Sequence, residues 1–478
     1  MQENGRSKTL TLAILPICLY LVIAPVWYPA IAARMYDNAR LLQLGVIALV
    51  VLSLLLPAVR SAVAEAWLAL GILPRVLLAV MVAVGALSAS FSGAPNLGAL
   101  EIALVTQLVL LYLLLSAAVR ILREKAESAL AVAICAGAAL VSIKFWVTYA
   151  SYTLEGKQFQ WISPFLDFAN VRFFSQYQAY ALLLIPLAAA MPGLCRTWRI
   201  VVYFIAANFW ALQWMIGSRA VWVGAVAGAI AVLALTRRGR IAWLGQQALL
   251  VVSGALIYLL FSQLVASAPG ATPVPGVRAV VEFGSQSDTD RMAMSSVSLK
   301  MLSEHPVLGI GPGQWGLNQV RVKNAHPHNS ALQLLSEYGL LAGAAGIALG
   351  MLLLLFCARA LRTQTRQDAN PVTTGLFAAL VMGLTDSMFS GNLIMPHSQI
   401  LLFVIAGWLV GRTQVTGPVG EREGRWQSGK LLLVGVAMLA MCTTTILAFE
   451  YVDVVNPMPG NLQLRHPHFW QYGRFADW

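Results

Sequence analysis

Long apolar stretches alternate with short polar segments along the whole chain. Many of these stretches contain close to twenty residues, which is the length of helix that crosses the hydrocarbon core of a membrane. A helix is the expected structure because it satisfies its own backbone hydrogen bonds where no water is present. Hydropathy predicts about thirteen spans, or twelve if the short stretch 399–411 does not cross completely. The predicted spans are 9–30, 41–59, 67–90, 99–119, 128–149, 177–192, 199–217, 220–236, 243–263, 331–357, 372–390, 399–411 and 430–449.

The composition agrees with this pattern. Of the 478 residues, 59% are hydrophobic and only 11% are charged, and a soluble globular protein cannot bury so much apolar surface. The first apolar stretch is too long for a cleavable signal peptide and lacks an obvious small-residue cleavage site, so we expect it to remain as the first span. The sequence therefore predicts an all-α polytopic membrane protein, with a transmembrane domain at 1–449 and a tail at 450–478.

Basic residues mark one side of the predicted membrane domain. When the spans alternate, the loops rich in Lys and Arg fall on the same side; they are 120–125, 196–199, 237–240, 359–366 and 412–430. The positive-inside rule makes that side cytoplasmic, so the N-terminus is inside and the tail is outside. The net charge of +12 is carried mostly by such loops and does not indicate nucleic-acid binding.

Two outer segments are long enough to fold, one at about 150–176 and the other at about 264–330. Apolar residues recur at helical spacing in the second segment, namely at Met294, Val297, Met301 and Leu302. This spacing predicts an amphipathic helix that lies on the membrane surface and ends before His305 and Pro306. The glycine-rich stretch 309–313 lacks the Gly-Lys-Ser/Thr of a P-loop, and we interpret it as a tight turn that brings backbone close to a site.

A histidine lies where the second outer segment meets the tenth predicted span. After His328, the polar residues Asn329, Gln333 and Glu337 recur at every fourth position of an otherwise apolar stretch. Polar groups at membrane depth are costly, so this stripe is expected to face a wet cavity or another helix. A histidine here can take a proton from an attacking hydroxyl near neutral pH. The alternative is structural, with His328 capping the helix and the stripe holding helices together.

Three arginines lie on the predicted outer side, which basic residues usually avoid; they are Arg172, Arg219 and Arg291. A guanidinium group binds a diphosphate well because its planar fork matches the phosphate oxygens and stays charged. The helix that starts after His328 adds its own attraction for an anion. A histidine base beside several arginines suggests a reaction on a lipid-linked diphosphate. The alternative is that the arginines extend to lipid headgroups.

Two other groups of polar residues have a structural and a functional interpretation. Asp288 and Asp290 have the spacing of an Asp-x-Asp metal pair, which suits a glycosyltransferase that uses a divalent cation. We favour helix capping by one of them and predict no metal site. Asp386 and His397 flank the turn between the eleventh and twelfth spans, where we favour a structural role over lining the cavity.

Three pieces of sequence occur in a fixed order. The first is SRA (Ser218–Ala220), which precedes an apolar span, and the second is DRMAMSSVSLKMLSEHPVLGIGPGQW (Asp290–Trp315). The third is HPHNSALQLLSEYGLLAG (His326–Gly343). In combination they resemble the O-antigen ligase family, which shares its core with O-antigen polymerases and protein O-oligosaccharyltransferases. The resemblance covers residues 170–400, and the last predicted span extends beyond the family's usual twelve.

The resemblance implies a GT-C-like glycosyltransferase in the bacterial inner membrane. Such an enzyme moves a glycan from undecaprenyl diphosphate to an acceptor hydroxyl at the periplasmic face, with inversion at the anomeric carbon and with no metal or other cofactor. The resemblance makes His328 the base that activates the acceptor. The substrate-binding residues that we expect, three of them as diphosphate ligands, are Arg219, Arg291 and Arg172, with Asn329, His326 and Glu337 beside them.

Several acceptors fit this chemistry. We expect ligation of O-antigen to lipid A–core first, while transfer to a protein hydroxyl such as that of a pilin, or polymerisation of the glycan, differs only in the acceptor. A transporter of lipid-linked sugars is the alternative from a different class, since charged residues in a membrane cavity suit it too. The selected residues gather on one side, however, whereas alternating access needs groups near the midplane. The expected partners are the lipid-linked donor, the acceptor and membrane lipids.

Overall fold

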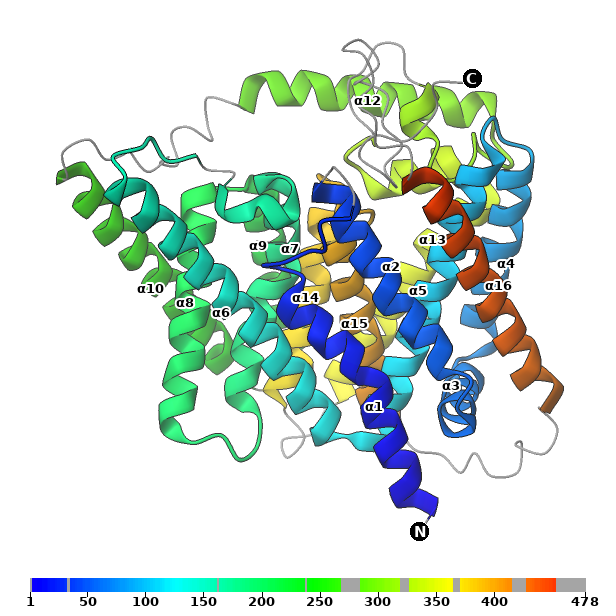
Figure 1. The fold of residues 1–478 in the computed structure, drawn as a ribbon, viewed down its shortest axis with the longest axis horizontal. Coiled ribbons are helices and arrows are strands. Elements are labelled where there is room, and N and C mark those ends of the chain that lie inside the picture. The colour runs from blue at the N-terminus through cyan, green and yellow to red at the C-terminus, as the bar shows by residue number, and fades with distance from the viewer. Residues whose placement is uncertain are drawn as a thin grey trace.

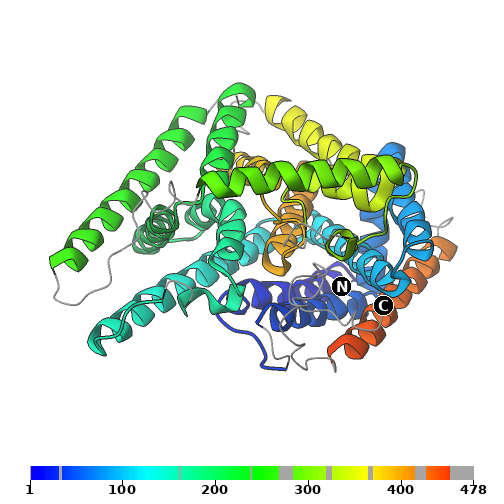
Figure 2. The same cartoon turned by 90° about the horizontal axis from the view of Figure 1, so that it is seen from above.

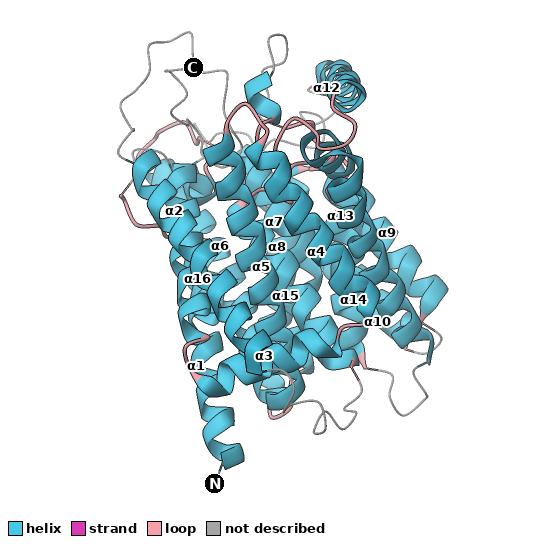
Figure 3. Ribbon diagram, turned by 90° about the vertical axis from the view of Figure 1, so that its right-hand side faces the viewer, coloured by secondary structure: helices cyan, strands magenta, loops and turns pink. Residues whose placement is uncertain are grey.

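The computed structural model describes residues 2–31, 35–160, 163–236, 239–267, 284–318, 326–363, 370–414 and 427–452. These residues form helices joined by turns, with no strand among them (Figures 1 and 3). The helices of the first half are α1 (Gln2–Ile23), α2 (Met35–Ser53), α3 (Pro57–Ala69), α4 (Ile72–Ser90), α5 (Pro95–Leu122), α6 (Glu124–Leu154), η1 (Ser163–Phe168), α7 (Val171–Leu184), η2 (Ile185–Ala190) and α8 (Arg196–Ile216). Those of the second half are α9 (Arg219–Leu235), α10 (Arg240–Ser267), α12 (Gly284–Glu304), η3 (Trp315–Asn318), α13 (Ser330–Thr363), α14 (Pro371–Asp386), α15 (Pro396–Thr413) and α16 (Gln427–Val452).

The chain is a polytopic, all-helical membrane protein, as predicted. Ten helices of the described residues are long and apolar enough to cross a membrane, which is fewer than the predicted number. The other predicted spans coincide with α9 and α14, which have 17 and 16 residues, and with α15, in which the polar residues His397, Ser398 and Gln399 follow the first residue, Pro396. Apart from its first residues, the predicted tail at 450–478 lies outside the described residues.

The bundle is organised around α5 and α14. The helix α5 is buried over most of its length and packs against α15, α16, α4 and α3, while α14 packs against α9 and α7. Glycines bring α9 and α14 together: a Cβ at Gly224 would lie 2.5 Å from the Met382 carbonyl oxygen, and one at Gly228 would lie 2.9 Å from that of Ala378. These two contacts show that α9 and α14 run antiparallel, and they fix the register between them.

Ion pairs gather at the end of the bundle that carries the N-terminus. Glu65 of α3 accepts from Arg6 of α1 at 2.5 Å and from Arg120 of α5 at 3.3 Å, and Glu127 of α6 pairs with Arg412 of α15. The helix α12 lies across the opposite end (Figures 1 and 3). The basic ends of these helices are therefore together and away from α12, in agreement with the predicted grouping of the basic loops.

The predicted surface helix exists as α12 and ends at Glu304, directly before His305 and Pro306. Its apolar face, however, packs on protein rather than on lipid. Met294 and Met301 are 1% and 6% exposed because they contact Trp315, with Ile310 beside them. The prediction of a helix lying on the membrane surface by this face was therefore wrong. Seen from above, α12 extends across several helices of the bundle (Figure 2).

Candidate active site

The helix α13 is broken at Gly339, and the loop after α12 fills the break. Gly339 has φ 71° and ψ −179°, which interrupts the helical backbone. The N–H groups of Ile310 and Gly311 donate to the carbonyls of Ser336 and Glu337, each at 3.0 Å, and the Leu340 N–H donates to Pro306 at 2.8 Å. The free backbone groups of the break thus pair with the loop 306–311. The glycine-rich stretch does bring backbone into close contact with α13.

The polar stripe of α13 mostly serves this junction. Glu337 is 1% exposed, and its carboxylate accepts from the Trp315 backbone N–H at 3.0 Å and from the Gln333 side-chain amide at 3.4 Å. Asn329 caps the helix, since its Oδ1 accepts from the Leu332 N–H at 3.0 Å, and its amide donates to the Met388 carbonyl at 3.3 Å. A role in binding substrate stays a prediction for both Glu337 and Asn329.

His328 lies just before α13, in an uncommon backbone conformation. Its φ is +53°, in the left-handed region that residues other than glycine rarely adopt. Its backbone N–H donates to Nδ1 of His326 at 3.2 Å, and the centroids of the two imidazole rings are 4.2 Å apart in an edge-to-face arrangement. His326 is 5% exposed whereas His328 is half-buried. The ring of His328 is therefore the more accessible of the two.

Two of the predicted arginines lower the pKa of His328. Burial, together with the smaller effect of the positive charges of Arg291 and Arg172, lowers the pKa of His328 from its ordinary value of 6.5 to about 4. Arg291 is exposed on α12, and Arg172 is exposed in the first turn of α7. The structure thus brings Arg172 near Arg291 and His328, each of which is more than a hundred positions away from it in the sequence. An imidazole beside two cations stays neutral at pH 7 and can accept a proton.

The third arginine lies at the same end of the bundle. Arg219 is exposed and is the first residue of α9. The register between α9 and α14 places Arg219 level with Ser387, the C-cap of α14. The Ser387 carbonyl accepts from the Ser330 N–H at 3.0 Å, which joins α14 to the start of α13. All three arginines therefore lie near the level of the α13 start.

Asp386 and His397 differ in their surroundings. The Asp386 carboxylate accepts from Ser390 and, at 2.9 Å, from Asn392, and it lies close enough to Arg291 for their charges to interact. His397 instead bonds the Ala24 carbonyl at 3.0 Å and packs against aromatic rings in the core. Asp386 therefore belongs to the polar end near α13, whereas His397 has the structural role that we favoured.

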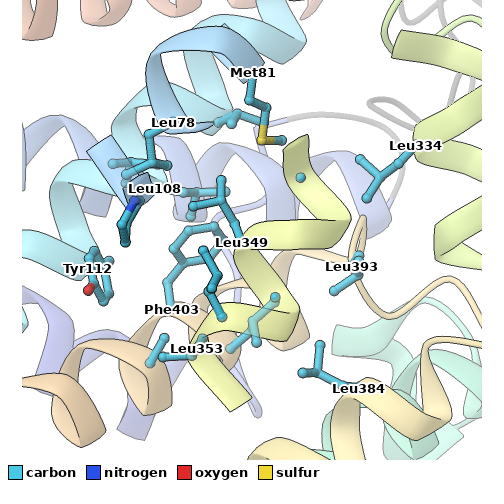
Figure 4. Close-up of a pocket in the computed structure, with 18 of the residues that line it drawn as sticks. Leu78, Met81, Leu108, Tyr112, Leu334, Leu349, Leu353, Leu384, Leu393 and Phe403 are labelled. Carbon is cyan, nitrogen blue, oxygen red and sulfur yellow. The ribbon is translucent and has the colours of Figure 1, made fainter. Parts of the chain in front are cut away.

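A cavity of about 580 Å³ lies between α4, α5, α13 and α15. Its walls are largely leucine side chains from these helices, with Met81, Tyr112 and Phe403 among them (Figure 4). The polar residues Glu101, Gln333, Glu337 and Ser330 also line it. Ser330 is two positions after His328, so an apolar chain in this cavity would extend to the start of α13.

A buried polar cluster that was not predicted from the sequence lies beside this cavity. Arg40 of α2 is fully buried, and its guanidinium donates to the side chains of Gln43 and Gln399, at 2.6 and 2.7 Å, and to the Ile394 carbonyl at 2.5 Å. Gln399 and Ile394 also line the cavity. The signal was present in the sequence, because ionisable residues at or within a predicted span, such as Arg40 and Glu101, indicate a functional or structural site.

No group of three or more His, Cys, Asp or Glu side chains suited to a metal is found among the described residues. The side chains of Asp288 and Asp290 lie outside the description, so the interpretation of the Asp-x-Asp pair is not tested. Positive charge near His328 comes from Arg291 and Arg172. Guanidinium groups can themselves neutralise a diphosphate.

The fold and the junction at His328 define a polytopic membrane protein with a candidate active site at the α12 end of its bundle. Residues 204–347 match the family model described as O-antigen ligase, which supports membership of the O-antigen ligase and polymerase superfamily. The match includes Arg219, Arg291 and His328 but not Arg172. No curated protein matches the chain. The match supports an enzyme of the ligase or polymerase type.

Proposed function

We propose that this protein is an O-antigen ligase-type glycosyltransferase. It moves a glycan from undecaprenyl diphosphate to a hydroxyl of lipid A–core at the periplasmic face of the bacterial inner membrane, and it needs no metal. The observation that carries this proposal is the position of His328, at the start of α13 and within the electrostatic reach of Arg291 and Arg172. The family match over residues 204–347 supports the same type of reaction.

In the proposed reaction, the acceptor hydroxyl oxygen attacks the anomeric carbon of the first donor sugar. The bond from that carbon to the diphosphate oxygen breaks, and its electron pair leaves with undecaprenyl diphosphate. His328 takes the hydroxyl proton and later releases it to solvent. Because attack and departure occur on opposite faces of the sugar ring, the anomeric configuration inverts.

The charges around His328 suit this step. A lowered pKa keeps the imidazole of His328 unprotonated at pH 7, and the negative charge of a bound diphosphate offsets the arginines so that the ring can accept a proton. The guanidinium groups of Arg172, Arg219 and Arg291 neutralise the charge that develops on the departing diphosphate. Since a diphosphate is already a good leaving group, the main tasks of the protein are to position the acceptor and remove its proton.

The apolar cavity supports a lipid-linked substrate. Its walls come from α4, α5, α13 and α15, and its lining extends to Ser330 beside the start of α13. A hydrocarbon chain held there gains from burial of apolar surface, while its headgroup stays near His328. A soluble sugar nucleotide would gain nothing from such walls.

The test is a reconstituted reaction with the purified full-length chain in detergent, lipid-linked donor and one acceptor at a time. The acceptors are lipid A–core, a pilin and the donor itself, and each is tried once with EDTA and once with added Mg²⁺ or Mn²⁺. Glycosylated lipid A–core is the expected product. Transfer only to pilin, or only to a second donor molecule, would mean that this molecule and not lipid A–core is the acceptor. Product formed in a single compartment excludes a transporter. If no acceptor gives product, the proposal that the protein is a glycosyltransferase is wrong.

A further inference from the structure

His326 shares the junction with His328 but has different neighbours. Its ring rests on Gly391, where a Cβ would come within 2.3–2.9 Å of three ring atoms. Its Nδ1 faces the backbone N–H of His328 at 3.2 Å. The ring of His326 therefore lies between the turn that follows α14 and the backbone of the proposed base.

This hydrogen bond defines the proton state of His326. A backbone N–H can only donate, so Nδ1 of His326 must be the acceptor and carries no proton. The proton of the neutral ring is then on Nε2, and protonation of Nδ1 would remove the acceptor. The bond to Nδ1 also helps to hold His328 at φ +53°, a conformation that its side chain alone does not favour.

We infer that His326 is a positioning residue, whose Nδ1 holds the backbone of His328 so that the imidazole of His328 meets the acceptor hydroxyl. The inference rests on the proposed function, because it takes His328 as the base. It assigns His326 a role distinct from binding substrate. The imidazole ring of His326 fits at this position because Gly391 has no side chain. Its edge-to-face contact with His328 fixes the angle between the two rings.

Two substitutions of similar size separate this role from a merely structural one. In asparagine the side-chain oxygen is attached where Nδ1 is attached in histidine, so His326→Asn keeps an acceptor for the His328 N–H. In glutamine the oxygen lies near the position of Nε2, so His326→Gln keeps polarity but loses that acceptor. Gly391→Ala provides an independent variant, because it displaces the ring of His326 and leaves both histidines in the chain.

The experiment measures kcat and KM for donor and acceptor in the reconstituted reaction, with each variant checked for monodispersity in detergent. We expect His326→Gln and Gly391→Ala to lower kcat about 100-fold with little change in either KM, the size of effect that a misplaced catalytic group produces. We expect His326→Asn to recover most of that loss. Equal activity of the Asn and Gln variants, or a change confined to the KM of one substrate, would overturn the inference.

His328→Ala is measured in parallel to keep the two proposals apart. If His328→Ala is inactive while the Asn and Gln variants of His326 behave alike, the positioning role is wrong and the proposed base stands. If His328→Ala retains transfer, His328 is not the base, and the positioning role of His326 is wrong as well.

Discussion

The Cα of Gly339 faces the carbonyl oxygen of Val307 so closely that a Cβ on it would lie 2.2 Å from that oxygen. The approach is reciprocal, since a Cβ at Gly309 would lie 2.4 Å from the Glu337 carbonyl oxygen. This close contact lets the loop after α12 pair with the broken turn of α13. The candidate active site is thus built on a junction that needs glycine on both sides.

The first prediction concerns this junction. Gly339→Ala should lower the thermal stability, because its φ of 71° and ψ of −179° belong to a region that is almost restricted to glycine. Strain of this kind costs about 1–3 kcal/mol before the clash with Val307 is added. The measurement is the Tm in detergent. Gly350→Ala, in the same helix with no atom within 4 Å of its Cβ, is the matched control, and equal loss in both variants would contradict the prediction.

The second prediction tests the proposed base. His328→Ala should lower the transfer rate by about 10²–10⁴-fold, the usual contribution of a general base, and leave the protein monodisperse. The control is His305→Ala, since His305 is an exposed histidine just after α12. The rate is measured with saturating donor and acceptor. Transfer by His328→Ala at the rate of the control variant would remove His328 from the mechanism.

Much of the fold could be predicted from the sequence, because a spanning helix is encoded locally by an apolar stretch of sufficient length. The end of α12 at Glu304 was also predicted from local sequence, because Pro306 disfavours a helical backbone at His305. The break at Gly339 was not predicted, since the stretch 331–357 reads as one continuous span. Only the tertiary pairing with Val307 shows why the helix stops and restarts there.

The site could be predicted only in part. A histidine at a loop-to-helix junction and arginines on the outer side are visible in the sequence, and the structure places Arg291 and Arg172 near His328. The cluster around Arg40 was missed because its partners Ile394 and Gln399 are more than 350 positions away. Hydrogen bonds between such distant residues depend on helix packing, which the hydropathy pattern does not specify.

The third prediction concerns metal. If arginines neutralise the diphosphate, EDTA should leave the transfer rate unchanged, because guanidinium groups replace the charge that a divalent cation would supply. The rate is measured with excess EDTA and again after Mg²⁺ or Mn²⁺ is added. A loss with EDTA that the added cation restores would favour a metal at Asp288 and Asp290 and would reverse the interpretation of that pair.

The fourth prediction concerns the charge on α12. Arg291→Gln removes a cation that disfavours the protonated imidazole of His328, so the pKa of His328 should rise from about 4 toward 6.5. A base must be unprotonated, so the acid limb of the pH profile of kcat/KM should move to higher pH. Lys300→Gln removes a charge of the same sign from the same helix at an exposed position and should leave that limb in place. Equal shifts in both variants would contradict a local effect of Arg291.

The fifth prediction follows from the charge that the donor brings. In the free enzyme, burial and the charges of Arg291 and Arg172 lower the pKa of His328 to about 4. A bound diphosphate adds negative charge and offsets the two arginines, which favours protonated His328 and raises its pKa in the complex. With the acceptor saturating, kcat/KM for the donor reports the enzyme before it binds donor, and kcat reports the complex with donor bound. The acid limb of kcat should therefore lie at higher pH than that of kcat/KM. Coincident limbs would mean that the diphosphate does not bind within reach of His328.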